Sequence, residues 1–301
     1  MKKYGLLVLL ALIWSTHFTV LNIANKAVHP FVVGMTIRFL TFLLLTVAIV
    51  KTGEIKKLFS IKGVWWKLIL IGILGYLLDA TSFMGFQVSD ANTGTILLKT
   101  DVLMANITSV IIFKEKFTKK DWLFTITMLA GVAMILGINP LHLKFDAGSI
   151  FFILSAFFVT MNAFTIKSVQ HSEHKVSNNI IAYYNNFITM LLFLASSLII
   201  GVQGEVKTLF TSSNIGVCIA IGGVMQFLIY MVYYICLDRF PVWIVKVFLL
   251  LIPLFTLVYS MILFGQMPGI SHLIGTLIII ASAVGIICEQ KNKSAAAEPA
   301  S

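Results

Sequence analysis

Residues 95–110 read TILLKTDVLMANITSV and place Lys99 and Asp101 in the middle of an apolar segment. Similar segments, each long enough to cross a bilayer as a helix of about 20 residues, fill nearly all of the chain. Arg38 and Asp79 also lie near the centres of such segments. A charge at bilayer depth costs roughly 2.5 to 3.5 kcal/mol on insertion scales, so such residues usually line a cavity or pair with each other. The pattern predicts a membrane protein that moves a polar solute.

Composition supports this prediction. Hydrophobic residues make up 59% of the 301 residues and charged residues 11%, whereas a soluble domain carries about 25% charge. The net charge of +10 does not indicate nucleic-acid binding, because the lysines lie in short loops between apolar segments, as the positive-inside rule describes. Cys218, Cys236 and Cys288 are scattered through apolar segments without metal-binding spacing, so we predict no metal site.

We predict an all-α integral membrane fold of ten transmembrane helices. With the N-terminus in the cytoplasm, 16 of the 22 lysines and arginines fall on the cytoplasmic side and three outside, and the other three lie within spans. This asymmetry predicts a multi-pass protein of the bacterial cytoplasmic (inner) membrane with both termini in the cytoplasm. Pro253 falls inside the ninth span and should kink it. The predicted spans lie near residues 4–25, 31–50, 68–88, 91–112, 122–139, 148–168, 176–201, 214–236, 242–264 and 271–288.

An internal repeat divides the chain. Residues 111–117 and 262–268 each end an apolar span, are followed by another, and are offset by 151 positions. The repeat predicts two five-helix units, 1–140 and 141–290, followed by a disordered cytoplasmic tail, 291–301. Because five is odd, the second unit enters the membrane from the opposite side, as in many secondary transporters with inverted repeats.

Several short motifs resemble those of EamA-type members of the drug/metabolite transporter superfamily. They are Trp14-Ser15 in the first span, Arg38-Phe39 in the second, residues 113–115 after the fourth, and Pro253 in the ninth. The resemblance covers about residues 4–288. It implies a carrier of small organic solutes, often an exporter or exchanger, with a central cavity lined mainly by spans 1, 3, 4, 6, 8 and 9.

The chain departs from the family pattern at two places. Lys99 and its neighbours stand where the family usually has a proline, and Gln266 replaces a glutamate. These departures leave the expected fold unchanged and suggest an unusual substrate.

The fourth span carries the principal candidate site. Asn92, Thr95, Lys99 and Asn106 recur at helical spacing and predict one polar stripe facing the cavity. Asp101 lies about 200° from Lys99 around the helix, so the two side chains should face different neighbours. We expect Lys99 to hold a carboxylate or phosphate of the substrate. The alternative is a structural ion pair with Asp79 or another acid.

The remaining charged candidates have two interpretations each. Asp79, with Tyr76 on its face, is expected to couple transport to protons or to bind a substrate ammonium; the alternative is a salt bridge to Lys99 or Arg38. The same two interpretations, proton coupling and a structural salt bridge, apply to Asp101. The fork-shaped guanidinium of Arg38 suits a substrate carboxylate, although packing would also explain it.

Four further residues complete the predicted substrate site. The 151-residue offset sets Lys246 against Thr95, so Lys99 and Lys246 could flank one anion; the alternative is a lysine that snorkels to the interface. Trp14 and His17 share a face of the first span, where His17 could relay protons or simply be hydrogen-bonded in the interior. Tyr230 could offer a hydrogen bond to a solute or hold helices together.

No nucleotide-binding, nucleophile or zinc motif occurs in the sequence, so we predict no enzymatic activity, no catalytic residues and no cofactor. The expected function is alternating-access transport of an amino acid or related organic anion, coupled to protons or to a counter-solute. The expected partners are this small molecule and membrane lipids. The alternatives are a carrier of organic cations or quaternary amines with Asp79 in an aromatic cage, and a non-transporting membrane partner subunit. A lipid-modifying membrane enzyme would need a convergent catalytic set, and the sequence contains none.

Overall fold

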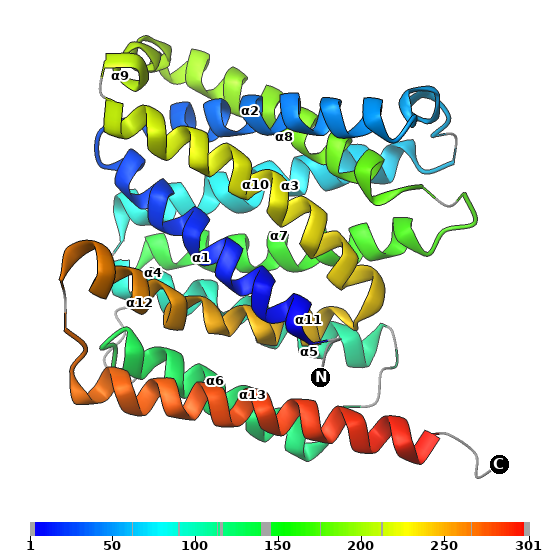
Figure 1. The fold of residues 1–301 in the computed structure, drawn as a ribbon, viewed down its shortest axis with the longest axis vertical. Helices are drawn as coiled ribbons and strands as arrows, with labels where there is room; N and C mark the ends of the chain where they lie inside the picture. The colour runs from blue at the N-terminus through cyan, green and yellow to red at the C-terminus, as the bar shows by residue number, and fades with distance from the viewer. Residues whose placement is uncertain are drawn as a thin grey trace.

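A computed structural model of the chain forms a bundle of helices (Figure 1). No strand occurs in the part of the chain that it describes. Helix α1 begins and α13 ends at the same end of the bundle (Figure 1). The described residues are 4–61, 63–89, 91–112, 114, 117–139, 146–174, 176–211, 213–265 and 267–297.

The long helices follow the predicted spans, and short 3₁₀ segments and one short helix join them. In the region of the first five predicted spans, the elements are α1 (Gly5–Asn25), α2 (Pro30–Lys51), the connecting η1 (Ile55–Phe59), α3 (Trp65–Val88), α4 (Ala91–Leu98) and α5 (Thr100–Ile111), which together form the fourth span, and α6 (Lys119–Ile135). The rest correspond to α7 (Ala147–Gln170), α8 (Asn178–Ile200), η3 (Gln203–Glu205), α9 (Val206–Thr211), α10 (Ser213–Arg239), α11 (Val242–Phe248), η4 (Leu249–Leu251), α12 (Ile252–Phe264) and α13 (Ile270–Ala297).

Local capping explains where several helices begin and end. Thr118, Asp146 and Ser177 precede α6, α7 and α8, and the side chain of each accepts a hydrogen bond from a backbone N–H in the first turn. Gly201 ends α8 and Gly265 ends α12 in left-handed conformations, with φ of 81° and 63°. The residues at these helix ends therefore determine where the helices begin and end.

Nine helical segments of the described chain are long and apolar enough to cross a membrane. The predicted fifth span corresponds to α6, which has only 17 residues, against the roughly 20 that a span needs. The all-helical, multi-span prediction is thus supported for nine segments. Helix α13 continues to Ala297, beyond residue 291, at which the sequence predicts a disordered tail.

Two of the spans are interrupted near their middles. Pro253 lies in the first turn of α12, directly after the 3₁₀ turn η4 that separates it from α11, so the predicted break in the ninth span is confirmed. The fourth span is also interrupted, at Lys99 between α4 and α5. The sequence predicts one continuous helix here, because no proline or glycine stands at the interruption.

Glycines bring the helices into close contact. Helices α6 and α13 pair along one edge of the bundle, and α2 and α8 lie along the opposite edge (Figure 1). A Cβ added to Gly275 of α13 would lie 2.7 Å from the carbonyl oxygen of Gly131 in α6. A Cβ at Gly72 of α3 would lie 2.5 Å from Ile188 of α8. Small residues at helix crossings allow this approach in lipid.

Candidate substrate-binding site

Arg38 of α2 is the centre of a buried polar cluster that joins three helices. Its Nη2 donates to Oδ2 of Asp79 on α3 at 2.5 Å, and its Nη1 donates to the hydroxyl of Tyr230 on α10 at 2.9 Å. The Arg38 side chain is 9% exposed and that of Asp79 is 29% exposed. The cluster contains one positive and one negative charge. For Asp79, the observed geometry is the salt bridge to Arg38 that the sequence analysis names as the alternative.

Two neighbours extend this Arg38 cluster. Asn186 of α8 is fully buried, and its Nδ2 donates to the backbone oxygen of Arg38 at 2.9 Å. His17 of α1 is buried and its Nδ1 lies 3.2 Å from the carbonyl oxygen of Gly222. This is the hydrogen-bonded interior histidine of the sequence analysis. Through this contact, one ring nitrogen of His17 links α1 to α10.

A second cluster surrounds the interruption between α4 and α5. Lys246 of α11 is 1% exposed and donates from Nζ to Oδ2 of Asp101 on α5 at 3.1 Å. A snorkelling lysine would be exposed at the interface, so that interpretation of Lys246 is wrong. Asp101 pairs with a neighbouring helix rather than with Lys99, as its position on the helix predicts.

Lys99 lies beside this pair. Its charge interacts with those of Asp101 and Lys246, yet within the described residues no acid lies within 4 Å of its ammonium. The side chain is half-buried at the junction of α4 and α5. The Lys99 cluster, which we define as Lys99, Asp101 and Lys246, therefore carries two positive charges and one negative charge. One more anion would neutralise it.

Aromatic side chains border the Lys99 cluster. Tyr233 of α10 is 5% exposed and interacts electrostatically with Lys246 and Asp101. Its ring meets that of Trp14 of α1 edge to face, with centroids 5.3 Å apart. Trp14 is thus connected to the cluster through Tyr233. The spacing of three residues between Tyr230 and Tyr233 predicts that they share a helix face, where both could offer hydrogen bonds to a solute or hold helices together.

Other predicted site residues lie elsewhere or have structural partners. The Tyr76 hydroxyl lies 2.5 Å from the Ser196 hydroxyl and links α3 to α8. Asn106 is fully buried and its Nδ2 donates to Thr125 of α6 at 3.4 Å, so it faces α6. Thr95 is half-buried on α4. The predicted polar stripe of span 4 is interrupted because α4 and α5 are separate helices.

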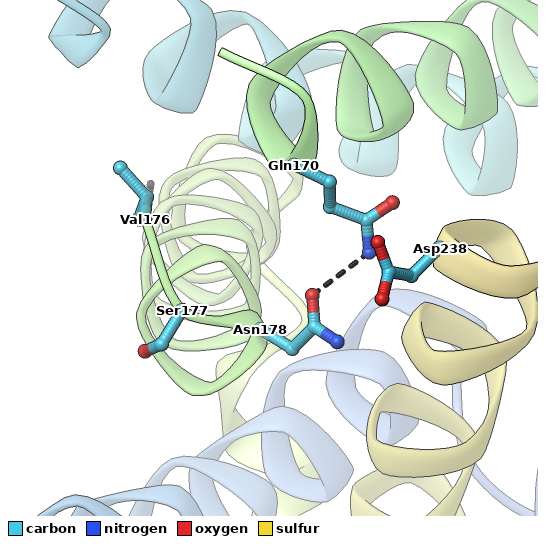
Figure 2. Close-up of a pocket in the computed structure, with 5 residues that line it drawn as sticks. All are labelled: Gln170, Val176, Ser177, Asn178 and Asp238. Atoms are coloured by element: carbon cyan, nitrogen blue, oxygen red, sulfur yellow. Dashed lines mark hydrogen bonds between the residues drawn. The ribbon is translucent and has the colours of Figure 1, made fainter. Parts of the chain in front are cut away.

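Two pockets lie at opposite ends of the bundle. The first, of about 240 Å³, is bordered by α7, α8 and α10, with the amide of Gln170 donating to Asn178 at 2.8 Å and the Asp238 carboxylate nearby (Figure 2). The second, of about 380 Å³, is bordered by Gly137 and Ser271. Neither contains a predicted site residue. Among the described residues, no three His, Cys, Asp or Glu side chains form a group that could hold a metal ion.

The buried, polar helix interruption of the Lys99 cluster is typical of solute carriers, and comparison with known proteins agrees. The sequence profile of the EamA-like transporter family matches residues 1–137 and 146–288. The chain belongs to the EamA-like transporter family. It is therefore a multi-pass membrane protein of a transporter family. Part of the motif resemblance rests on Phe113 and Glu115, which lie outside the described residues, as does Gln266, where the chain departs from the family pattern.

Individual relatives add the fold and little more. An uncharacterized transporter of Archaeoglobus fulgidus is 24% identical over 202 residues, which are 67% of this chain and 60% of that protein. The match thus spans less than two thirds of the relative's length. A solved crystal structure superposes with a TM-score of 0.77 at 15% identity, covering 95% of this chain and 97% of the other. At that identity the similarity shows the fold alone.

Proposed function

We propose that this family member carries a small organic anion, such as an amino acid or a related carboxylate, and that Lys99 binds its negative charge. The observation that supports this most directly is the charge of the Lys99 cluster, in which two lysines share a single aspartate. Burying an uncompensated charge is costly. A substrate anion would complete the cluster, while Trp14 and Tyr233 offer an aromatic wall and a hydroxyl.

Alternating access by two inverted five-helix repeats is the proposed mechanism. The interruption at Lys99 and the 3₁₀ turn at Leu249–Leu251 are related by the 151-residue offset of the sequence repeat. Helix packing follows the same relation, since α3 packs on α7 and α8 as α10 packs on α1 and α2. Paired interrupted helices at the repeat interface are a recurrent form of transport site.

For orientation, we propose that both termini are cytoplasmic. The support is that α1 begins and α13 ends at the same end of the bundle (Figure 1), together with the excess of lysines in the loops at that end. The proposed location is the bacterial cytoplasmic membrane.

Proton coupling is assigned to Asp79 in this proposal. Its carboxylate is 29% exposed, so protons can reach it, and its protonation would release Arg38. Asp101 is the weaker candidate for coupling, because it already compensates Lys246. A carrier of organic cations is disfavoured, because Arg38 neutralises the acid that would have to bind the substrate.

The test uses purified protein in detergent and in proteoliposomes. A panel of carboxylates, amino acids and organic phosphates is screened for an increase in melting temperature, since a ligand that binds only the native state stabilises it. Flux of the best anion is then compared in Lys99→Ala and in the control Lys120→Ala, whose side chain is 69% exposed. A charged hydrogen bond contributes about 1.5 to 3 kcal/mol, so Lys99→Ala should lose roughly 10-fold or more in affinity.

Two outcomes would contradict the proposal. One is unchanged binding and flux of the anion in Lys99→Ala. The other is stabilisation of the wild-type protein by cationic solutes and by none of the anions.

A further inference from the structure

Two glutamates outside the proposed substrate site occupy matching places at opposite ends of the bundle. Glu54 follows α2, and Glu205 follows α8. The two positions are 151 residues apart, which is the offset of the sequence repeat. Each glutamate therefore has the same place in its own half of the chain.

Glu54 holds the beginning of α8. The residue is only 8% exposed. Its carboxylate accepts hydrogen bonds from the side chains of Asn179, at 2.8 Å, and Thr52, at 3.0 Å. Ser177, which caps the N-terminus of α8, also bonds to it. A carboxylate at a helix N-terminus is favoured by the helix dipole.

Glu205 holds the beginning of α2 through a backbone donor instead of side chains. Its Oε2 accepts a hydrogen bond of 2.6 Å from the backbone N–H of His29, the residue that caps the N-terminus of α2. Each of these two antiparallel helices is thus followed by a glutamate that caps the other. In the middle of the pair, Asn186 of α8 bonds to the backbone oxygen of Arg38 in α2.

The links from this pair to the next helices are also duplicated. Thr189 of α8 donates to the carbonyl oxygen of Gly72 in α3 at 2.9 Å, and Thr41 of α2 donates to that of Gly223 in α10 at 3.1 Å. The two accepting glycines are again 151 residues apart.

Contacts at the Lys99 cluster are not duplicated. The offset maps Lys246 onto Thr95 and Asp101 onto Ile252, so the equivalent positions cannot form an ion pair. In a carrier built from inverted repeats, the two halves move against each other around a fixed site. If the halves exchange conformations, a contact that both halves make is kept. A contact that only one half makes must then change.

We infer that Glu54 and Glu205 are reciprocal caps that fix α2 to α8 at both membrane faces, and that this pair is the stationary axis of the transport movement. Helices α4, α5, α11 and α12 then move against it. The inference rests on the proposed function, and it assigns positioning roles to two residues that do not touch the substrate.

The test cross-links the axis and a moving contact in a protein whose three cysteines have been replaced. The axis pair is Glu54→Cys with Asn179→Cys, joined by a short bifunctional thiol reagent. The moving pair is Ser15→Cys of α1 with Thr256→Cys of α12, whose native hydroxyls lie 3.0 Å apart, oxidised to a disulfide. Flux of the anion identified by thermal shift is measured before and after cross-linking and again after reduction.

Cross-linking the axis pair should leave at least about half of the flux, and the disulfide between α1 and α12 should lower flux by about 10-fold or more, reversibly. Loss of flux on cross-linking the axis pair would overturn the inference. A parent protein that carries none of the anions contradicts the proposed function instead.

A second readout does not depend on flux. Thr95→Cys on α4 is labelled with an impermeant thiol reagent applied from one side of the membrane, in Glu54→Gln and in Glu205→Gln. If the glutamates cap an axis, both variants lower the melting temperature and neither changes the sidedness of labelling. If each glutamate instead closes the transport path at its own membrane face, Glu54→Gln increases labelling from one side and Glu205→Gln from the other. The inference then fails.

Discussion

The Arg38 cluster and the Lys99 cluster are both buried, both join helices from the two halves of the chain, and differ in charge balance. Arg38 faces one aspartate and a tyrosine hydroxyl. Lys246 pairs with the single carboxylate of Asp101, and Lys99 lies beside this pair and interacts with both charges over a longer distance. The first arrangement is balanced in charge and suits a structural or proton-responsive role. The second has an excess positive charge, which is the property expected of a site that awaits an anion.

The largest expected effect comes from Asp101→Asn. It leaves the buried Lys246 and the half-buried Lys99 without a counter-charge, and breaking a buried ion pair typically costs about 3 to 5 kcal/mol. The measurement is thermal or denaturant unfolding in detergent. The control is Lys120→Gln, which breaks the Lys120–Glu289 pair at its exposed end, where the Lys120 side chain is 69% exposed, and should cost less than about 1 kcal/mol. Equal losses in the two variants would show that the Lys99 cluster is not strongly coupled.

Asp79→Asn should have a smaller effect, because the amide oxygen still accepts a hydrogen bond from Arg38. We expect a loss of about 1 to 3 kcal/mol and little change in the affinity for the anion at fixed pH. The pH dependence of flux should weaken if Asp79 couples transport to protons. An unaltered pH profile would remove Asp79 from that role, and Ser82→Ala, one turn along α3, serves as the control.

Lys99→Met distinguishes the two clusters by the sign of its effect on stability. Removing an uncompensated cation should leave the free energy of unfolding within about 1 kcal/mol of wild type, or raise it. Adding Lys99→Met to Asp101→Asn should recover part of the lost stability. A large destabilisation by Lys99→Met alone would mean that Lys99 already has a structural partner.

The smallest effect concerns Glu54. Burial by itself would raise the pKa of this carboxyl, but hydrogen bonds from Asn179, Ser177 and Thr52 outweigh it and hold the pKa below the ordinary value near 4.5. The stabilisation is therefore complete above that value and is lost as the pH falls below it. Unfolding measured from pH 6 down to about 3.5 should show a shallower loss in Glu54→Gln than in wild type. Parallel curves would contradict the cap.

The sequence predicts the helical membrane fold well, because each span must be apolar and the loops on one side carry most of the lysines. Pro253 also reveals its own interruption, since proline cannot continue a hydrogen-bonded helix. The interruption at Lys99 is invisible in the sequence, because Leu98, Lys99 and Thr100 are all compatible with a helix. It depends on packing against α7 and α11, which a single sequence does not encode locally.

The site is only partly predictable for the same reason. Charges at membrane depth identify Arg38, Asp79, Lys99 and Asp101, but their pairing depends on which helices are neighbours. The angular separation of Lys99 and Asp101 assumes one continuous helix, whereas the structure divides this span at Lys99. Glu54 and Glu205 lie in loops, where charges are ordinary, and only the repeat offset distinguishes them.

The contact between Gly131 and Gly275 has a consequence for how the protein is assembled. Helix α6 packs chiefly on α13, and α13 begins at Ile270, long after α6 ends at Ile135. During translation, the narrow glycine face of α6 must therefore wait in lipid until α13 leaves the ribosome. Any chain that stops short of residue 270 leaves this helix without its main partner, and quality-control proteases that recognise unassembled membrane segments should remove it.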